Sequence, residues 1–349
     1  MGFSPAHPSV SHRPLTRRAV LAGAALAVAL LPLSQPGRAS AWATLTAASG
    51  WLRSQQLPEG GFTGFSGEAD PSFTALAIVA LAAAAAADPA NAAAITRAAG
   101  WLEGQAADYA AQGPGAAAIA AAAAVAAGRD PVSFGGADLV AGMSVPLPEG
   151  AEPAAPGLLG NDVNDHAEIM LGLAAAGRPV DPALVAALEG ARSEDGGWSY
   201  DAQPGAGVMD SNTTALVIQA CAAAGEPGRA LLPGAVRALA RFLVPGKGYA
   251  YQLTEPLVAD ANSTALVIQA LIAAGEDPAS AAWGDAPAAL AGFANPDGSF
   301  TFMAGDPEPS LYAALQAIPA LAGKPLPVAR LCASGEEAAS GCVAAATGA

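Results

Sequence analysis

The chain has 349 residues, of which 53% are hydrophobic and only 13% are charged, and its formal net charge is −15. This acidic excess makes nucleic acid and anionic membranes poor partners, because both repel a negatively charged surface. The length exceeds that of a typical single domain, but repeat proteins often form one core of this size.

The first 41 residues have the layout of an export signal. Arg17 and Arg18 precede an apolar run over residues 19–33, and residues 39–41 (Ala-Ser-Ala) offer a small-residue cleavage site. The apolar run is short for a membrane span, and the paired arginines favour the twin-arginine route. We expect an exported protein, extracellular or in the cell envelope, with a retained N-terminal anchor as the alternative. Cleavage would leave 11 basic and 30 acidic residues, a net charge of −19, and no membrane span.

Beyond the signal, the sequence repeats itself about every 48 residues. The two clearest copies cover residues 210–225 and 260–275. A third, over residues 162–177, keeps their Asp-x-Asn-x-x-Ala start and closing glycine. Weaker copies begin near residues 70, 113 and 307, which makes six units. A fixed period of this length indicates one supersecondary unit stacked on copies of itself, since a single unit cannot bury its apolar face alone.

Each copy predicts two helices. Asn212 and Asn262 are expected to be the N-caps of an Ala-rich helix that ends at a glycine. Asp-Pro pairs, such as Asp181-Pro182, then predict the start of a second, more polar helix. Ala-rich helices can approach one another closely, which suits an inner ring covered by the second helices. The sequence thus predicts an all-α fold, an α/α toroid of six helix pairs over residues 42–325.

The connectors between the helix pairs carry a family resemblance. Residues 50–62 and 193–198, with their Gly-Gly-aromatic turns, resemble the repeats of squalene–hopene cyclases, terpene cyclases and protein prenyltransferase β-subunits. The Asn-Ser-Thr-Ala-Leu-Val-Ile-Gln run from Asn262 is similar to inner-helix starts in the α-domain of the cobalamin carriers transcobalamin and intrinsic factor. The resemblance implies the toroid of this superfamily. It does not decide the function, because unrelated activities share that scaffold.

One stretch resembles a catalytic motif. Residues 162–165 match the spacing of the Asp-x-Asp-Asp motif, whose middle acid protonates an alkene in class II terpene cyclases. Here the middle residue is Asn164, and an amide has no proton of useful acidity. The Asp-x-Asn pattern also recurs in the sister repeats, which favours a role in capping. Asp165 remains a weak catalytic candidate, as a relocated acid.

Metal and nucleophile chemistry find little support in the sequence. A zinc site of the prenyltransferase kind needs Asp, Cys and His ligands together, but His166 is the sole histidine after the signal, and Cys221 lies in an apolar helix. A Ser-His-Asp triad would need the same histidine, and no Gly-x-Ser-x-Gly motif is present. No metal is expected, and cobalamin is a possible ligand rather than an assured cofactor.

Polar side chains at the helix starts predict a ligand site at one rim of the ring, because the N-termini of the inner helices would share one face. Glutamines seven residues after the asparagines would lie two turns deeper on the same side. Aromatic residues of the connectors would complete the walls. The residues expected in this site are Asp162, Asp165, His166, Trp198, Tyr200, Asp210, Asn212, Thr214, Gln219, Tyr249, Tyr251, Asp260, Asn262, Thr264, Gln269 and Phe300.

Three functions fit this pattern. The first is an exported, non-catalytic toroid that binds a small hydrophobic or corrinoid ligand, with a partner protein completing the site. The alternative is a terpene-cyclase-like or prenyltransferase-like enzyme that acts on an isoprenoid. The third is a structural or protein-interaction toroid.

The C-terminal tail, residues 326–349, holds two cysteines. Cys332 and Cys342 could close a small disulfide loop in an oxidising compartment.

Overall fold

The computed structural model describes residues 36–147 and 152–330, with side chains from residue 43 onward. Contacts divide the chain into Met1–Ala39 and Ser40–Ala349, and the fold below is that of the second unit. The predicted export signal therefore lies almost wholly outside the described residues, and so do Cys332 and Cys342. Within the described part, no helix is long and apolar enough to cross a membrane.

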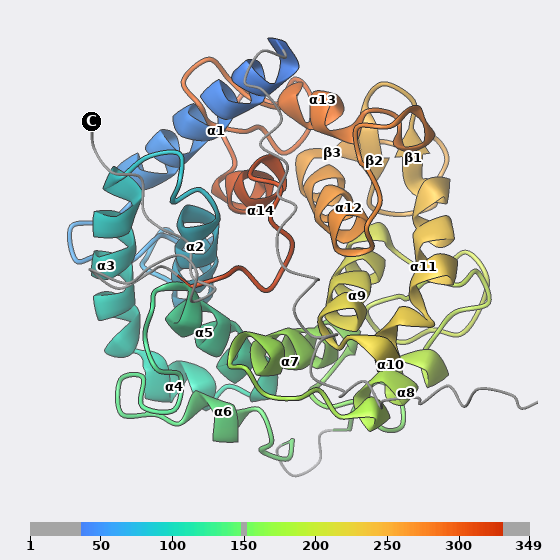
Figure 1. Cartoon of the computed structure of the whole chain (residues 1–349), viewed down its shortest axis with the longest axis horizontal. Coiled ribbons are helices and arrows are strands. Elements are labelled where there is room, and N and C mark those ends of the chain that lie inside the picture. Colours follow the sequence, from blue (N-terminus) through green and yellow to red (C-terminus); the bar gives the residue numbers. More distant parts are fainter. Residues whose placement is uncertain (1–35, 148–151, 331–349) are drawn as a thin grey trace, which may run out of the picture. The chain divides into compact units, whose positions relative to one another are not determined.

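Six helices form a closed inner ring (Figure 1). Each packs against the next in chain order, and the last packs against the first, so that the ring closes. The starts of α7, α9 and α12 fall within one residue of the predicted repeat starts, and each of these helices ends two residues before the predicted glycine. The inner helices are α2 (Pro71–Ala83), α5 (Pro114–Ala126), α7 (Val163–Ala175), α9 (Ser211–Ala223), α12 (Ala261–Ala273) and α14 (Leu311–Leu321).

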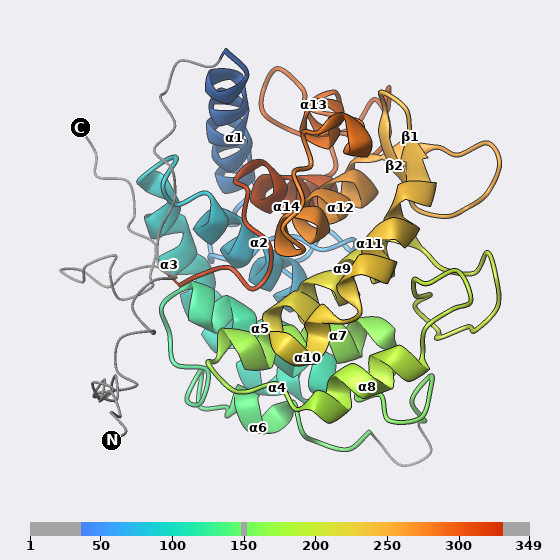
Figure 2. The same cartoon turned by 45° about the vertical axis from the view of Figure 1, so that its right-hand side comes forward.

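Further helices, of 4 to 19 residues, surround this ring and form a less regular layer. Figure 2 shows α3 outside α2 and α8 outside α7. Two short helices, α4 and α6, pack on α5, while α10 and α11 pack on α9, and α13 packs on both α12 and α14. The mostly helical architecture is confirmed, although the outer layer is not a set of six equal partners. The outer helices are α1 (Pro36–Ser54), α3 (Ala90–Glu103), α4 (Ala106–Ala110), α6 (Leu139–Gly142), α8 (Pro182–Gly190), α10 (Glu226–Arg229), α11 (Leu232–Leu239) and α13 (Ala286–Ala291), with 3₁₀ turns η1 (Ala240–Phe242) and η2 (Ala281–Trp283).

The connectors add a small amount of β-structure that the all-α prediction left out. β1 (Leu243–Val244), β2 (Gly248–Ala250) and β3 (Ala259–Asp260) form an antiparallel sheet in that order. Leu243 pairs with Tyr249, and Tyr249 pairs with Asp260. The cause is the glycine turn ahead of each aromatic, which folds the connector back on itself as a hairpin.

Small side chains allow the inner helices to pack closely. α5 and α7 are in such close contact that a Cβ added at Gly172 would lie 3.0 Å from both Cα and Cβ of Ala118. Glycines just past the helices adopt the predicted left-handed backbone, with φ of 67° at Gly177 and 83° at Gly275. The alanine-rich composition of the inner helices is thus a requirement of the ring.

The N-caps are aspartates and not the predicted asparagines. The Ser263 N–H donates to Asp260 Oδ1 at 2.7 Å, and the Thr213 N–H donates to Asp210 Oδ1 at 2.7 Å. The aspartates have the extended backbone of a cap residue. Asn212 and Asn262 are therefore the second residues of their helices, and their amides take no part in the caps.

Threonines four residues after the caps hold the connectors in place. Thr264 Oγ1 accepts the N–H of Tyr249 at 2.9 Å and donates to the carbonyl of Asp260 at 2.7 Å. Thr214 binds the N–H of Trp198 in the same way, at 3.0 Å. Both threonines are fully buried in these contacts, and neither lines the cavity described below.

We predict that Thr264→Val lowers the free energy of unfolding by about 1–3 kcal/mol. The change keeps the shape of the side chain but leaves the buried N–H of Tyr249 without its acceptor. Urea unfolding measures the loss, and Thr96→Val, on the exposed face of α3, is the control, with an effect within about 0.5 kcal/mol. Equal effects of the two substitutions would contradict this role for Thr264.

Candidate functional site

The same positions of the inner helices face a cavity on the axis of the ring. They lie two, six and nine residues after the N-cap residue. Their spacings of four and three residues place them on one helical face. They form three tiers from the helix N-termini downward. The rim tier contains Asn164, Asn212, Asn262 and Tyr312; the middle tier contains Leu76, Ile119, Glu168, Leu216, Leu266 and Gln316; the lower tier contains Val79, Ala122, Leu171, Gln269 and Pro319.

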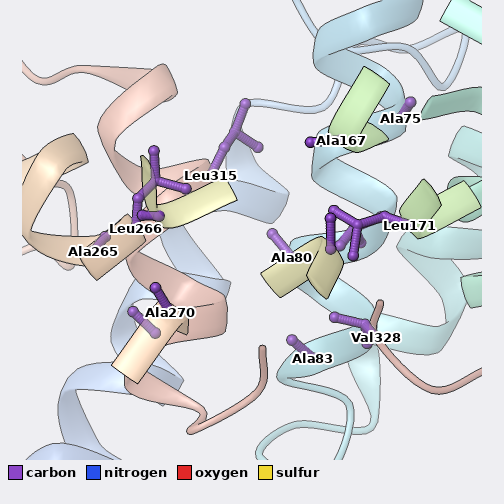
Figure 3. Close-up of a cluster of buried hydrophobic side chains, with 14 of the residues drawn as sticks. Ala75, Ala80, Ala83, Ala167, Leu171, Ala265, Leu266, Ala270, Leu315 and Val328 are labelled. Carbon is purple, nitrogen blue, oxygen red and sulfur yellow. The ribbon is translucent and has the colours of Figure 1, made fainter. Parts of the chain in front are cut away.

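The cavity has a volume of about 490 Å³ and mostly apolar walls. Figure 3 shows Leu266 beside Leu315, with Leu171 and Val328 across from them. Residues 326–328, which follow α14, return to the ring and line the cavity as well. The Leu326 N–H donates to Gln219 Oε1 at 2.8 Å, which places this segment at the level of the lower tier.

Only the second aromatic residue of a connector reaches the cavity. Tyr251 and Phe302 line it, and their carbonyls accept the first helical N–H groups of α9 and α12 at 2.9 Å. Tyr200 is the equivalent residue of the preceding connector, but its side chain is 52% exposed and lies outside the cavity.

The first aromatic residue of each connector is buried behind the wall, contrary to the predicted site. The Trp198 Nε1–H donates to the carbonyl of Leu188 at 2.7 Å, and the Tyr249 hydroxyl donates to the carbonyl of Trp283 at 3.2 Å. Phe300 is also fully buried and does not line the cavity. These large rings fill the space between inner and outer helices.

His166 and Asp165 also have structural contacts in place of cavity contacts. His166 accepts the N–H of Leu159 at Nδ1 (2.8 Å), and its Nε2 donates to the carbonyl of Leu184 (2.9 Å), while burial lowers its pKa. Asp165 accepts the N–H of Asn161 at 2.8 Å, and it lies so close to α5 that a Cβ at Gly115 would overlap it. Asp165 is therefore not placed to act on a molecule in the cavity.

The cap aspartates differ in their access to the cavity. Asp210 and Asp260 line its rim, whereas Asp162 does not. Asp260 is bound by Ser263, whose Oγ donates to Oδ2 at 2.7 Å. Burial raises the pKa of Asp162, Asp210 and Asp260, while hydrogen bonds from the first turn of each helix act in the opposite direction.

Glu168 lines the cavity but is absent from the predicted site. It occupies the middle tier, where the other five inner helices carry Leu, Ile or Gln. Burial raises its pKa to about 8, and the nearby Asp165 and Asp162 carboxylates add to the shift. Both effects favour the protonated form of the Glu168 carboxyl. Alignment of the repeats offered the signal, because Glu168 stands where the two clearest copies have Leu216 and Leu266.

The cavity offers no counter-charge to an anion. Among the described residues that line it, none is Lys, Arg or His. Over residues 36–147 and 152–330, no group of three or more His, Cys, Asp or Glu side chains could hold a metal ion. The wall thus combines apolar groups with carboxyl and amide groups.

Comparison with solved structures shows the fold. A variant of the type II terpene cyclase MstE from Scytonema, in complex with the substrate geranylgeranyl dihydroxybenzoate, matches 82% of this chain and 98% of its own at 16% identity and a TM-score of 0.61. A polysaccharide lyase matches 82% of this chain and 97% of its own at 10% identity and a TM-score of 0.58. A possible member of the GH105 family from Salmonella enterica matches 84% and 95% at 12% identity and a TM-score of 0.57.

No protein-family model matches the sequence, and no curated protein matches it either. At these identities the structural likeness shows a scaffold that enzymes of different chemistry share, and the function has to be argued from the cavity itself.

We predict that Glu168→Leu stabilises the protein, and more so at high pH. The raised pKa of Glu168 favours folding below the unfolded pKa of about 4.5, and this contribution is lost as the pH rises through about 8. The increase in the free energy of unfolding caused by Glu168→Leu should therefore be roughly 3 kcal/mol larger at pH 8 than at pH 5. Urea unfolding at both pH values measures it. Glu189→Leu, on the exposed face of α8, is the control, and a pH-independent difference at Glu168 would contradict the shift.

Proposed function

We propose that the cavity binds an isoprenoid and that the chain acts on it as a proton-initiated, terpene-cyclase-like enzyme, built on an α/α toroid of six helix pairs. The observation that carries this proposal is the position of Glu168, the carboxyl group in the middle tier of a mostly apolar wall, where burial raises its pKa to about 8. Glu168 lies one helical turn after Asn164, and Asn164 is the residue that replaces the middle acid of the cyclase motif.

The size and lining of the cavity support an isoprenoid ligand. A volume of about 490 Å³ lies within the range of small-molecule sites. Leu, Ile, Val and Ala side chains of five inner helices make most of the middle and lower tiers, which suits a branched hydrocarbon chain. The structurally similar cyclase MstE binds a geranylgeranyl substrate and the product merosterolic acid A.

The proposed reaction begins with proton transfer from Glu168. Its O–H bond breaks, the carboxylate keeps the electron pair, and the proton bonds to an epoxide oxygen of the isoprenoid. The C–O bond of the epoxide then opens, and a neighbouring double bond attacks the developing cation. The ring cation finally loses a proton to water, and a proton from solvent restores the Glu168 carboxyl, so that product and substrate are isomers. A carboxylic acid with a pKa near 8 is a weak proton donor, which favours an epoxide oxygen over a bare alkene.

Aromatic residues near the rim support the same chemistry. Tyr251, Phe302 and Tyr312 line the cavity, and the face of an aromatic ring attracts positive charge. Asp210 and Asp260 add carboxyl groups at this end. These groups would favour a cationic intermediate over its neutral precursor.

The corrinoid hypothesis loses most of the contacts on which it was based. It placed the ligand over the rim, held by the Asp, Asn and Thr residues of the helix starts. Asp210, Asp260, Thr214 and Thr264 are instead engaged in caps and connectors, and the space lies inside the ring. The purely structural function assumed an interior filled by side chains, so the cavity argues against it as well.

Export remains part of the proposal. A twin-arginine signal over residues 1–41 would deliver the folded ring to the cell exterior. N-terminal sequencing of protein recovered outside the cell tests this; a chain that begins at Met1 or stays in the cytoplasm would refute it.

We predict that the purified protein converts a terminal epoxide of geranylgeraniol, which keeps the donor hydroxyl, into a cyclic isomer. Glu168→Gln should lower kcat by about 100-fold or more, since it removes the proton donor, while substrate binding changes little. Gas chromatography with mass spectrometry detects the product, and dialysis measures binding.

Asp165→Asn is the matched control for this experiment. It alters a neighbouring acid on α7 that does not line the cavity, and its amide oxygen can still accept the Asn161 N–H. Turnover in this variant should stay within a few-fold of the original chain. Loss of turnover in Asp165→Asn but not in Glu168→Gln would transfer the role to Asp165.

A further inference from the structure

Three amide oxygens in the cavity wall have no hydrogen-bond donor among the described residues. They are Asn164 Oδ1, Asn262 Oδ1 and Gln269 Oε1, and each is cut off from bulk solvent. The side chain of Gln269 is fully buried, and Asn262 is only 3% exposed. All three residues line the same cavity. Because a buried acceptor without a donor is costly, their gathering in one place points to a molecule that supplies donors.

The orientation of Gln269 follows from its other contacts. Its Nε2–H donates to the carbonyl of Gln316 at 3.2 Å and lies 3.4 Å from the carbonyl of Ala265. Rotation of the amide by half a turn would place its oxygen against these two carbonyl oxygens. The oxygen is therefore the atom that remains available, and it can only accept.

A sister repeat shows what such an oxygen binds. Gln219 stands at the same position of α9, and its Nε2 likewise lies 3.4 Å from the carbonyl four residues earlier, that of Ala215. Its Oε1, however, accepts the N–H of Leu326 at 2.8 Å. The glutamine oxygen of this tier thus takes a donor where the chain provides one. At Gln269 no described residue provides one.

The rim of the cavity, like the site of Gln269, has hydrogen-bond acceptors without matching donors. Asn164 and Asn262 hold unpaired acceptor oxygens there, and Asp210 and Asp260 contribute carboxyl groups, while no described Lys, Arg or His lines the cavity. Asn262 and Gln269 are seven residues apart on α12, which separates them by about 10 Å along the helix axis. The cavity can therefore receive donors at two depths, with apolar wall between them.

We propose that the cavity selects isoprenoids that carry hydroxyl or amino groups, which donate to Gln269 in the lower tier and to Asn262 or Asn164 at the rim. This proposal rests on the isoprenoid function above and narrows the substrate class. Phosphorylated and carboxylated isoprenoids are excluded, because they bring negative charge and acceptor atoms to a wall that already holds carboxyl groups and unpaired acceptors.

The test compares four probes with the same C20 chain: geranylgeraniol, its methyl ether, geranylgeranylamine and geranylgeranyl phosphate. The alcohol and the ether differ chiefly in the donor hydrogen. Equilibrium dialysis against the full chain should show the alcohol or the amine binding about 10-fold more tightly than the ether, with the phosphate weakest.

Variants identify the amide that the single hydroxyl of the probe reaches. In one of Gln269→Met, Asn262→Leu and Asn164→Leu, the preference for alcohol over ether should fall to about one while the affinity for the ether is kept. Thr96→Val, on the exposed face of α3 and outside the cavity, should leave both the preference and the affinities intact. Thermal unfolding of each variant confirms that it folds.

Three outcomes would overturn the inference. They are equal binding of alcohol and ether to the original chain, a preference that survives in all three amide variants, and strongest binding of the phosphate. In the first two cases an isoprenoid still binds, so the proposed function would stand without its polar selectivity. If none of the four probes binds, the proposed function fails together with the inference.

Discussion

The hydrogen bond from the first helical turn to the capping aspartate is the contact on which the rest of this structure depends. It sets where each inner helix begins, and so decides which residues face the axis of the ring. Asp162, Asp210 and Asp260 all make this bond to the N–H three residues later, at 2.7–2.9 Å. With the start fixed, the second, sixth and ninth positions point inward from helix to helix. One replacement at an inward position can therefore change the chemistry of the cavity without changing the scaffold.

Two further constraints make the ring possible, and both involve residue size. Small residues such as Gly172 and Ala118 let α5 and α7 approach closely, while large rings such as Trp198 and Tyr249 fill the space behind them. These groups are needed for packing, so they are not available to a ligand. The inward-facing residues of the three tiers are not part of these helix–helix contacts, so their side chains can differ without loss of the ring.

The repeat predicted the inner helices well because a single period carries the cap, the apolar face and the closing glycine together. It assigned the cap to Asn212 and Asn262 because Asn and Asp are almost equal as caps, and only the backbone geometry separates them. It placed Trp198, Tyr249 and Phe300 in the site because the sequence does not show which of two alternating aromatics turns inward. Residues 326–328 line the cavity but lie after the last repeat, so the repeat pattern could not predict their position.

Glu168 was missed for a different reason. The stretch around it resembles the motif of another family at Asn164 and Asp165, whereas its difference from the sister repeats lies at Glu168. Glu168 is the acid of the middle tier, and the sister repeats have Leu216 and Leu266 at the same position. In this chain, a departure from the internal repeat thus points to the acid in the cavity wall, and similarity to the external motif does not.

The most direct test of the account is the protonation state of Glu168. Infrared difference spectra between the original chain and Glu168→Gln, recorded across a pH titration, isolate the carbonyl stretch of this one carboxyl group. The account predicts a protonated-acid band at pH 7 that disappears near pH 8. A band already lost by about pH 5, the behaviour of an ordinary exposed glutamate, would contradict it.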